Sequence, residues 1–154
     1  MARVCVFDLI GSPDSVIALH MGGAYEDRPA TAARFVETML PETAVLRYLD
    51  LENSERVWAV AEIVETALPL SIPAITDAFH HNLNPAGLAL EQVLDLSLPT
   101  WEGRGVRPKL HLSSQDPAKQ GGAHAYLVDD RAADAMVEAT GKERALAPLG
   151  VEIG

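Results

Sequence analysis

Residues that could bind a divalent metal ion recur along the chain, each within or just after an apolar segment. They are, in chain order, His20, Glu52, Asp77, His111 and Glu138. Imidazole and carboxylate groups without thiolate suit manganese, zinc or iron, and the single cysteine of the chain offers no pair of thiolates. A lone residue of this kind is usually structural, so the prediction depends on the recurrence. The pattern predicts a metal site able to clamp and polarise a phosphodiester for hydrolysis.

Two further histidines extend this set. His80 comes three residues after Asp77, on what we expect to be a tight loop, and His124 lies in the glycine-rich segment 121–125. His80 is close enough to Asp77 to serve the same ion or an adjacent one, and the small neighbours of His124 would let the backbone approach a metal. The neighbouring His81 is predicted to have a packing or supporting role instead.

Apolar runs alternate with helical patterns along the chain. Strands are expected at residues 16–19, 45–51, 72–76, 108–112 and 135–137, and helices at 31–40, 57–68 and 88–98. Units of roughly 30 residues, each a strand followed by a helix, predict parallel α/β structure with right-handed crossovers. Active-site residues of parallel barrels lie at the C-terminal ends of strands, so the candidate ligands would meet at one rim.

The length limits the architecture that these units can build. A closed eight-unit barrel usually needs about 200 residues or more, and the chain has 154. We therefore expect one domain over residues 1–154, a partial TIM-type (β/α) barrel of about five βα units. A doubly wound open sheet is the competing architecture, but its glycine-rich phosphate loop has no counterpart beyond Gly22-Gly23.

Charge and hydropathy narrow the classes of partner. The net charge of −10 counts against nucleic-acid binding, which depends on lysine and arginine, although bound metal ions would offset part of the acidity. No segment approaches the roughly 20 consecutive apolar residues that cross a bilayer. The chain does not begin with a signal-peptide pattern. A cytoplasmic location without a membrane partner is expected.

Five segments of the chain carry a resemblance to a known family. They are His20-Met-Gly-Gly-Ala-Tyr25, Leu51-Glu-Asn53, Asp77-Ala-Phe-His-His-Asn-Leu-Asn-Pro85, Pro108-Lys-Leu-His-Leu-Ser-Ser-Gln115 and Val137-Glu-Ala-Thr-Gly-Lys-Glu143. In this order and spacing they resemble consecutive motifs of UV damage endonucleases, over nearly the whole chain.

The resemblance implies a fold, a reaction and a ligand set. Family members have a TIM-like barrel with a cluster of metal ions, usually manganese, and nick damaged double-stranded DNA directly 5′ to the lesion. By this resemblance the metal ligands would be His20, Glu52, Asp77, His111 and Glu138, with His80 and His124 holding a further ion. Lys109 matches a family lysine that lies at the metal site and can be carboxylated, which implies a catalytic role.

The chain also departs from the family pattern. Earlier strands of the family carry further histidine ligands and the residues that probe damaged bases, and no segment corresponds to them. We therefore expect a partial metal site and reduced or absent nicking activity. The stretch 128–133 is too short for the helix expected before the last strand.

Two other functions stay open on the sequence. Metal-dependent sugar isomerases and epimerases also place Glu, Asp and His at barrel strand ends. Alternatively, the chain could be a non-catalytic remnant that associates through its open sheet edges, either as a homo-oligomer or with a complementing N-terminal segment.

Overall fold

Five parallel strands form the centre of the structure, a computed structural model that describes residue 11, residues 15–140 and residues 150–153. The strands are β1 (Ile17–Leu19), β2 (Leu49–Glu52), β3 (Ala74–Asp77), β4 (Lys109–Leu112) and β5 (Gly150–Ile153). Each pairs in parallel with the next strand along the chain. Because the order never reverses, the sheet is not doubly wound. The fold is a partial TIM-type (β/α) barrel, as expected from the sequence.

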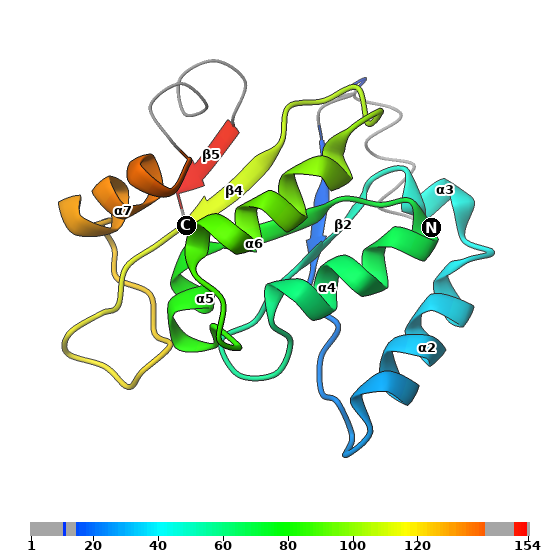
Figure 1. Ribbon diagram of the computed structural model, residues 1–154, viewed down its shortest axis with the longest axis horizontal. Helices are drawn as coiled ribbons and strands as arrows, with labels where there is room; N and C mark the ends of the chain where they lie inside the picture. Colours follow the sequence, from blue (N-terminus) through cyan, green and yellow to red (C-terminus); the bar gives the residue numbers. More distant parts are fainter. Residues whose placement is uncertain (1–10, 12–14, 141–149, 154) are drawn as a thin grey trace.

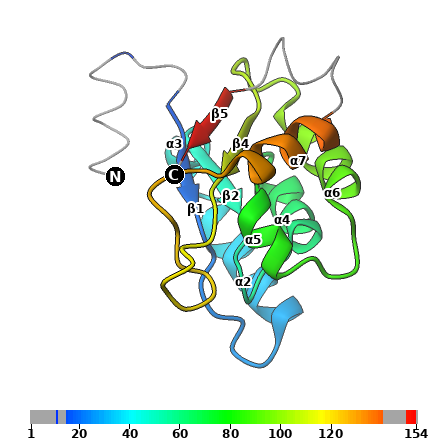
Figure 2. The same ribbon diagram turned by 90° about the vertical axis from the view of Figure 1, so that its left-hand side faces the viewer.

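Helices cover one side of this sheet, as Figures 1 and 2 show. The longer ones are α2 (Arg28–Met39), α4 (Val60–Ala67), α6 (Leu90–Ser97) and α7 (Asp130–Thr140). Shorter helical segments are α3 (Thr43–Leu46), α5 (Ala78–Leu83) and the 3-10 turns η1 (Leu68–Leu70) and η2 (Leu98–Trp101). Right-handed crossovers in an unreversed order place the helices on the same face. Among the described helices, none combines the length and hydropathy needed to span a bilayer.

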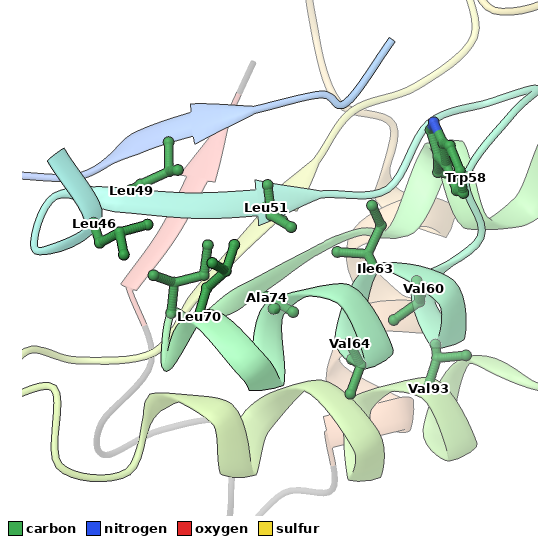
Figure 3. Packing of buried hydrophobic residues seen from close by; sticks show 12 residues of the cluster. Leu46, Leu49, Leu51, Trp58, Val60, Ile63, Val64, Leu70, Ala74 and Val93 are labelled. Carbon is green, nitrogen blue, oxygen red and sulfur yellow. The ribbon is translucent and has the colours of Figure 1, made fainter. Parts of the chain in front are cut away.

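The main core lies between β2, β3 and the helices α4 and α6. Leu49 and Leu51 of β2 pack with Ile63 and Val64 of α4 (Figure 3). Successive side chains of a strand point to opposite faces. Asp50 and Glu52 therefore lie on the other face of β2, the face away from the helices. This alternation leaves one side of the sheet apolar and gives the other side carboxylates.

The C-terminal part of the chain differs from the sequence prediction. The strand expected at residues 135–137 is wrong, because these residues belong to α7. Ala132, Ala133 and Met136 recur at helical spacing and pack in the cluster that also holds Leu110 of β4. The helix before the last strand is therefore present, and its expected absence is also wrong. The last strand comes later, at β5; residues 141–143 of the fifth motif lie outside the described residues.

Two shorter segments also differ. The strand expected at 45–51 begins only at Leu49, because Leu46 is the last residue of α3 and its backbone N–H donates to the Glu42 carbonyl. The loop expected after Asp77 is the short helix α5, whose first turn is capped by the Asp77 carboxylate accepting from the His80 N–H.

A buried arginine contact holds the N-terminal end of β2. The Arg104 guanidinium, in the segment before β4, donates to the carbonyls of Leu46 and Leu49 at 3.1 and 3.3 Å. It also lies 3.4 Å from Asp50 Oδ1, and the Asp50 side chain is fully buried. A buried carboxylate is costly without a paired charge, so Arg104 is expected to be important for stability.

We expect Arg104→Ala to lower the free energy of unfolding by about 3 kcal/mol, because it removes the guanidinium that pairs with the buried Asp50 carboxylate. Urea denaturation measures this loss. Arg107→Ala removes the same charge from an exposed position of the same segment and should change stability by about 0.5 kcal/mol or less. Similar losses in the two variants would contradict the role given to Arg104.

Candidate metal centre

The C-terminal ends of four neighbouring strands bring together the predicted ligands. His20 directly follows β1, Glu52 ends β2, Asp77 ends β3 and His111 lies near the end of β4. Asp77 and His111 are direct partners in the register of β3 and β4. Because the strands are parallel, these ends share one edge of the sheet.

The carboxylate of Glu52 is at the centre of this group. His111 Nδ1 donates to Glu52 Oε1 at 2.8 Å. His20 Nε2 lies 3.6 Å from Oε2, and His80 Nδ1 lies 4.0 Å from Oε1. Only 5% of Glu52 is exposed. A single buried carboxylate thus contacts or faces imidazoles from three other segments of the chain.

Two sets of side chains have the spacing of metal ligands. One set is His20, Glu52 and His80, and the other is Glu52, Asp77 and His111; within each set the ligand atoms lie within 4.8 Å of one another. Ligand atoms sit about 2.0–2.2 Å from ions such as zinc, so this spacing allows a common ion. Glu52 belongs to both sets: its Oε2 faces His20 of the first set, and its Oε1 contacts His111 of the second.

His124 reaches the same place from the long segment 113–129 after β4. Its Nε2 atom lies 3.3 Å from His80 Nε2, and the Phe79 ring meets the His124 ring edge to face at 5.3 Å between centroids. His80 Nδ1 donates to the Asn53 carbonyl, so His80 Nε2 is the nitrogen that faces His124. The two imidazoles form an extension of the Glu52 group.

Glu138 is the predicted ligand that the structure does not bring to this rim. It lies on α7, it is exposed, and neither of the sets found among the described residues includes it. The sequence placed it at the end of a strand at residue 137, and that position is wrong because the segment is helical. The ligand role that the family resemblance implies for Glu138 stays a prediction.

Lys109 and Glu152 lie beside His111 in the sheet. Lys109 is two residues before His111, so the two share a face of β4, while Leu110 and Leu112 point into the core. In the pairing of β4 with β5, His111 is the register partner of Glu152. The sequence prediction missed this position, although the alternation of Val151, Glu152 and Ile153 is the signal of a strand.

Asn53 joins the ends of β2 and β3 and was also missed. It is fully buried; its Oδ1 accepts from the Asp77 N–H at 2.7 Å and its Nδ2 donates to the Asp77 carbonyl at 3.1 Å. Its own carbonyl is the acceptor for His80 Nδ1. Asn53 therefore fixes the relative positions of Glu52, Asp77 and His80.

Comparison with known proteins places the chain in a family. The sequence model of the family described as UV-endonuclease UvdE matches residues 5–153. The chain belongs to the UvdE family. This confirms the resemblance found in the sequence.

Relatives of known name agree with this assignment. A UV DNA damage endonuclease of Bacillus cereus (strain B4264) is 34% identical over 127 residues, and one of Bacillus thuringiensis subsp. konkukian (strain 97-27) is 33% identical over 126. Each match covers 80% of this chain and 40% of the relative. The crystal structure of SacUVDE superposes with a TM-score of 0.84 at 22% identity, over 99% of this chain and 50% of that chain. The chain thus spans half or less of these proteins, and the SacUVDE match supports the fold.

His81 is a buried imidazole on α5, next to His80 in the sequence. It is 3% exposed, and its Nδ1 atom has no hydrogen-bond partner among the described residues. Burial lowers the pKa of His81 from the ordinary 6.5, and a hydrogen bond with the Leu88 backbone only partly opposes this. The folded chain therefore holds His81 in its neutral form.

We expect Asn53→Ala to weaken Mn²⁺ binding about 10- to 100-fold, the usual effect of removing a group that orients ligands. Isothermal titration calorimetry measures the affinity. Ser54→Ala is the matched control, because the Ser54 hydroxyl accepts from the N–H groups of Val57 and Trp58 and makes no contact with Asp77. Unchanged affinity in a folded Asn53→Ala protein would contradict the positioning role.

We expect the metal-free chain to lose stability as the pH falls below about 6.5, in part through His81. The unfolded chain binds a proton at His81 at its ordinary pKa of 6.5, whereas the folded chain resists it. His81→Gln should therefore lose less stability than the native chain between pH 7.5 and pH 5.5, in urea denaturation with EDTA. Equal losses would show that His81 does not contribute to the pH dependence.

Proposed function

We propose that the chain takes part in repair of UV-damaged DNA, by metal-dependent hydrolysis of a phosphodiester 5′ to a lesion in double-stranded DNA. The observation that carries this proposal is the buried Glu52 carboxylate among His20, His80 and His111, at the C-terminal rim of a UvdE-family chain. The named relatives are UV DNA damage endonucleases, which supports damaged DNA as the substrate.

The residues present fit divalent metal ions. Glu52 and Asp77 are 5% and 3% exposed and lie at adjacent strand ends, and burying two carboxylates is costly without a counter-charge. Their combination with imidazoles suits manganese, and zinc and iron accept similar ligands. We propose His20, Glu52, Asp77, His80, His111 and His124 as the ligands. When bound, such ions would polarise the phosphoryl oxygens and neutralise developing charge.

The side chains have separate tasks in this proposal. In hydrolysis the oxygen of a water molecule bonds to phosphorus and the bond to the 3′ oxygen breaks. Lys109, on the same face as His111, is proposed as a catalytic residue whose charge stabilises the negative charge that develops on the phosphate. Asn53 and His80 hold the ligand atoms in place through the backbone contacts described above.

Family membership favours this function over the alternatives. The sugar isomerase reading depended only on acidic and histidine residues at barrel strand ends, whereas the UvdE match extends over residues 5–153. The non-catalytic alternative predicts different results in two measurements, because a remnant would neither retain metal nor nick DNA.

We expect Glu52→Gln to lose bound Mn²⁺ and to reduce nicking of UV-irradiated supercoiled plasmid about 100-fold or more, because the carboxylate shared by both ligand sets is neutralised. Glu65→Gln makes the same chemical change at an exposed position of α4, on the helical side of the sheet, and should match the native chain in both assays. Metal content is measured by mass spectrometry after loading and desalting.

Two outcomes would contradict the proposal. One is a folded native chain that retains no divalent metal and leaves irradiated plasmid intact. The other is equal loss of metal in Glu52→Gln and Glu65→Gln, which would mean that the loss does not depend on the Glu52 site.

A further inference from the structure

Two exposed apolar residues stand together on the segment 113–129, next to the candidate metal centre. Tyr126 is 96% exposed and Leu127 is 81% exposed, and they are neighbours in sequence. Single exposed apolar residues are common on protein surfaces. A fully exposed pair is less usual, and beside a catalytic site such loop residues often contact the substrate.

The segment that carries them is held in a defined shape. The Gln115 side chain accepts from the Gly122 N–H and donates to the carbonyls of Asp116 and Gln120. On the two sides of the exposed pair, the N–H groups of Ala125 and Asp129 donate to Ser114, at its carbonyl and its hydroxyl. The pair is therefore presented on an anchored loop.

The loop also lies against the site. His124, two residues before Tyr126, has its Nε2 atom 3.3 Å from His80 Nε2. Gly122 lies close to Glu55, in the segment that follows β2: a Cβ atom on Gly122 would be 3.4 Å from Glu55 Cγ. Figure 1 shows this segment, drawn yellow to orange, projecting beyond the C-terminal end of β4. A substrate held at the Glu52 group would have this loop beside it.

The charge near the pair gives phosphate contacts only a small part in binding. The Lys119 ammonium is 5.9 Å from the centre of the Tyr126 ring and is paired with Asp116 at 3.1 Å. For a chain of net charge −10, phosphate contacts alone are a weak source of affinity. Stacking of an aromatic ring on a base does not depend on phosphate charge.

We propose that Tyr126 and Leu127 form a wedge that contacts the bases of the damaged duplex, with the Tyr126 ring stacked on an unstacked base and Leu127 beside it. This inference rests on the proposed function, since it takes DNA as the occupant of the site. A lesion favours the contact, because a damaged base pair costs less to unstack than an intact one. Apolar side chains inserted at base steps are a known means of gripping distorted DNA.

The test uses the full chain and a 30-base-pair duplex with one thymine dimer and 2-aminopurine in the opposite strand. We expect Tyr126→Ala to weaken binding about 10-fold or more, as for loss of one stacked base, and to abolish the change in 2-aminopurine fluorescence. Tyr126→Phe should retain both, because it keeps the ring. Leu127→Ala should lie between them. Leu68→Ala removes a side chain that is 60% exposed on η1, on the helical side, and should bind like the native chain.

A second readout separates stacking from charge. The salt dependence of binding should be the same in Tyr126→Ala and the native chain, because no phosphate contact is removed. The wedge would be overturned if Tyr126→Ala and Leu127→Ala both bound the duplex with the affinity of the native chain and gave the same 2-aminopurine response as the native chain. A loss of affinity in Tyr126→Phe equal to that in Tyr126→Ala would also overturn it.

The same samples distinguish failure of the wedge from failure of the proposed function. If the native chain binds the dimer duplex through Tyr126 but retains no metal and does not nick, the hydrolytic function fails and the wedge stands. If metal is retained and plasmid is nicked while Tyr126→Ala binds normally, only the wedge fails. A native chain that does not bind the duplex overturns both.

Discussion

The burial of carboxylates at the end of a parallel sheet is the constraint on which the rest of this structure depends. Glu52 and Asp77 are almost inaccessible to water and lie on adjacent strands. Negative charges in such a place need nearby donors or cations. The structure supplies donors from His111 to Glu52 and from the His80 backbone to Asp77. The Asn53 amide then holds the backbone of Asp77 against the end of β2.

Much of this arrangement could be predicted from the sequence because it follows from local patterns. The apolar runs predicted β1, β3 and β4 to within a few residues, and a predicted ligand lies in or just after each of these strands. In parallel βα units those ends must share a rim, so the convergence of His20, Glu52, Asp77 and His111 followed from topology alone.

The parts that were missed depend on longer-range packing. The run at residues 135–137 is too short to distinguish a strand from a turn of helix, and the contacts of Met136 with the β4 cluster decide for the helix. The apolar start of the 45–51 run is helical because Leu46 packs in the main core. Asn53 was visible only as part of a motif, since its role depends on a strand that begins 21 residues later. The alternation of Val151, Glu152 and Ile153 indicates a strand, but its pairing with β4 depends on long-range contacts that the sequence does not show.

The alternation Leu49-Asp50-Leu51-Glu52 has a consequence for folding that is separate from catalysis. A strand displaced by one position would turn both leucines toward the ligand side and drive both acids into the hydrophobic layer beneath α4. Burial of an acid in that layer without a partner is strongly unfavourable, so other alignments of β2 are less stable than the native one. The acidic side chains proposed for the chemistry at the rim thus also favour a single register of β2. Replacing these acids with neutral residues would make other registers of β2 less unfavourable.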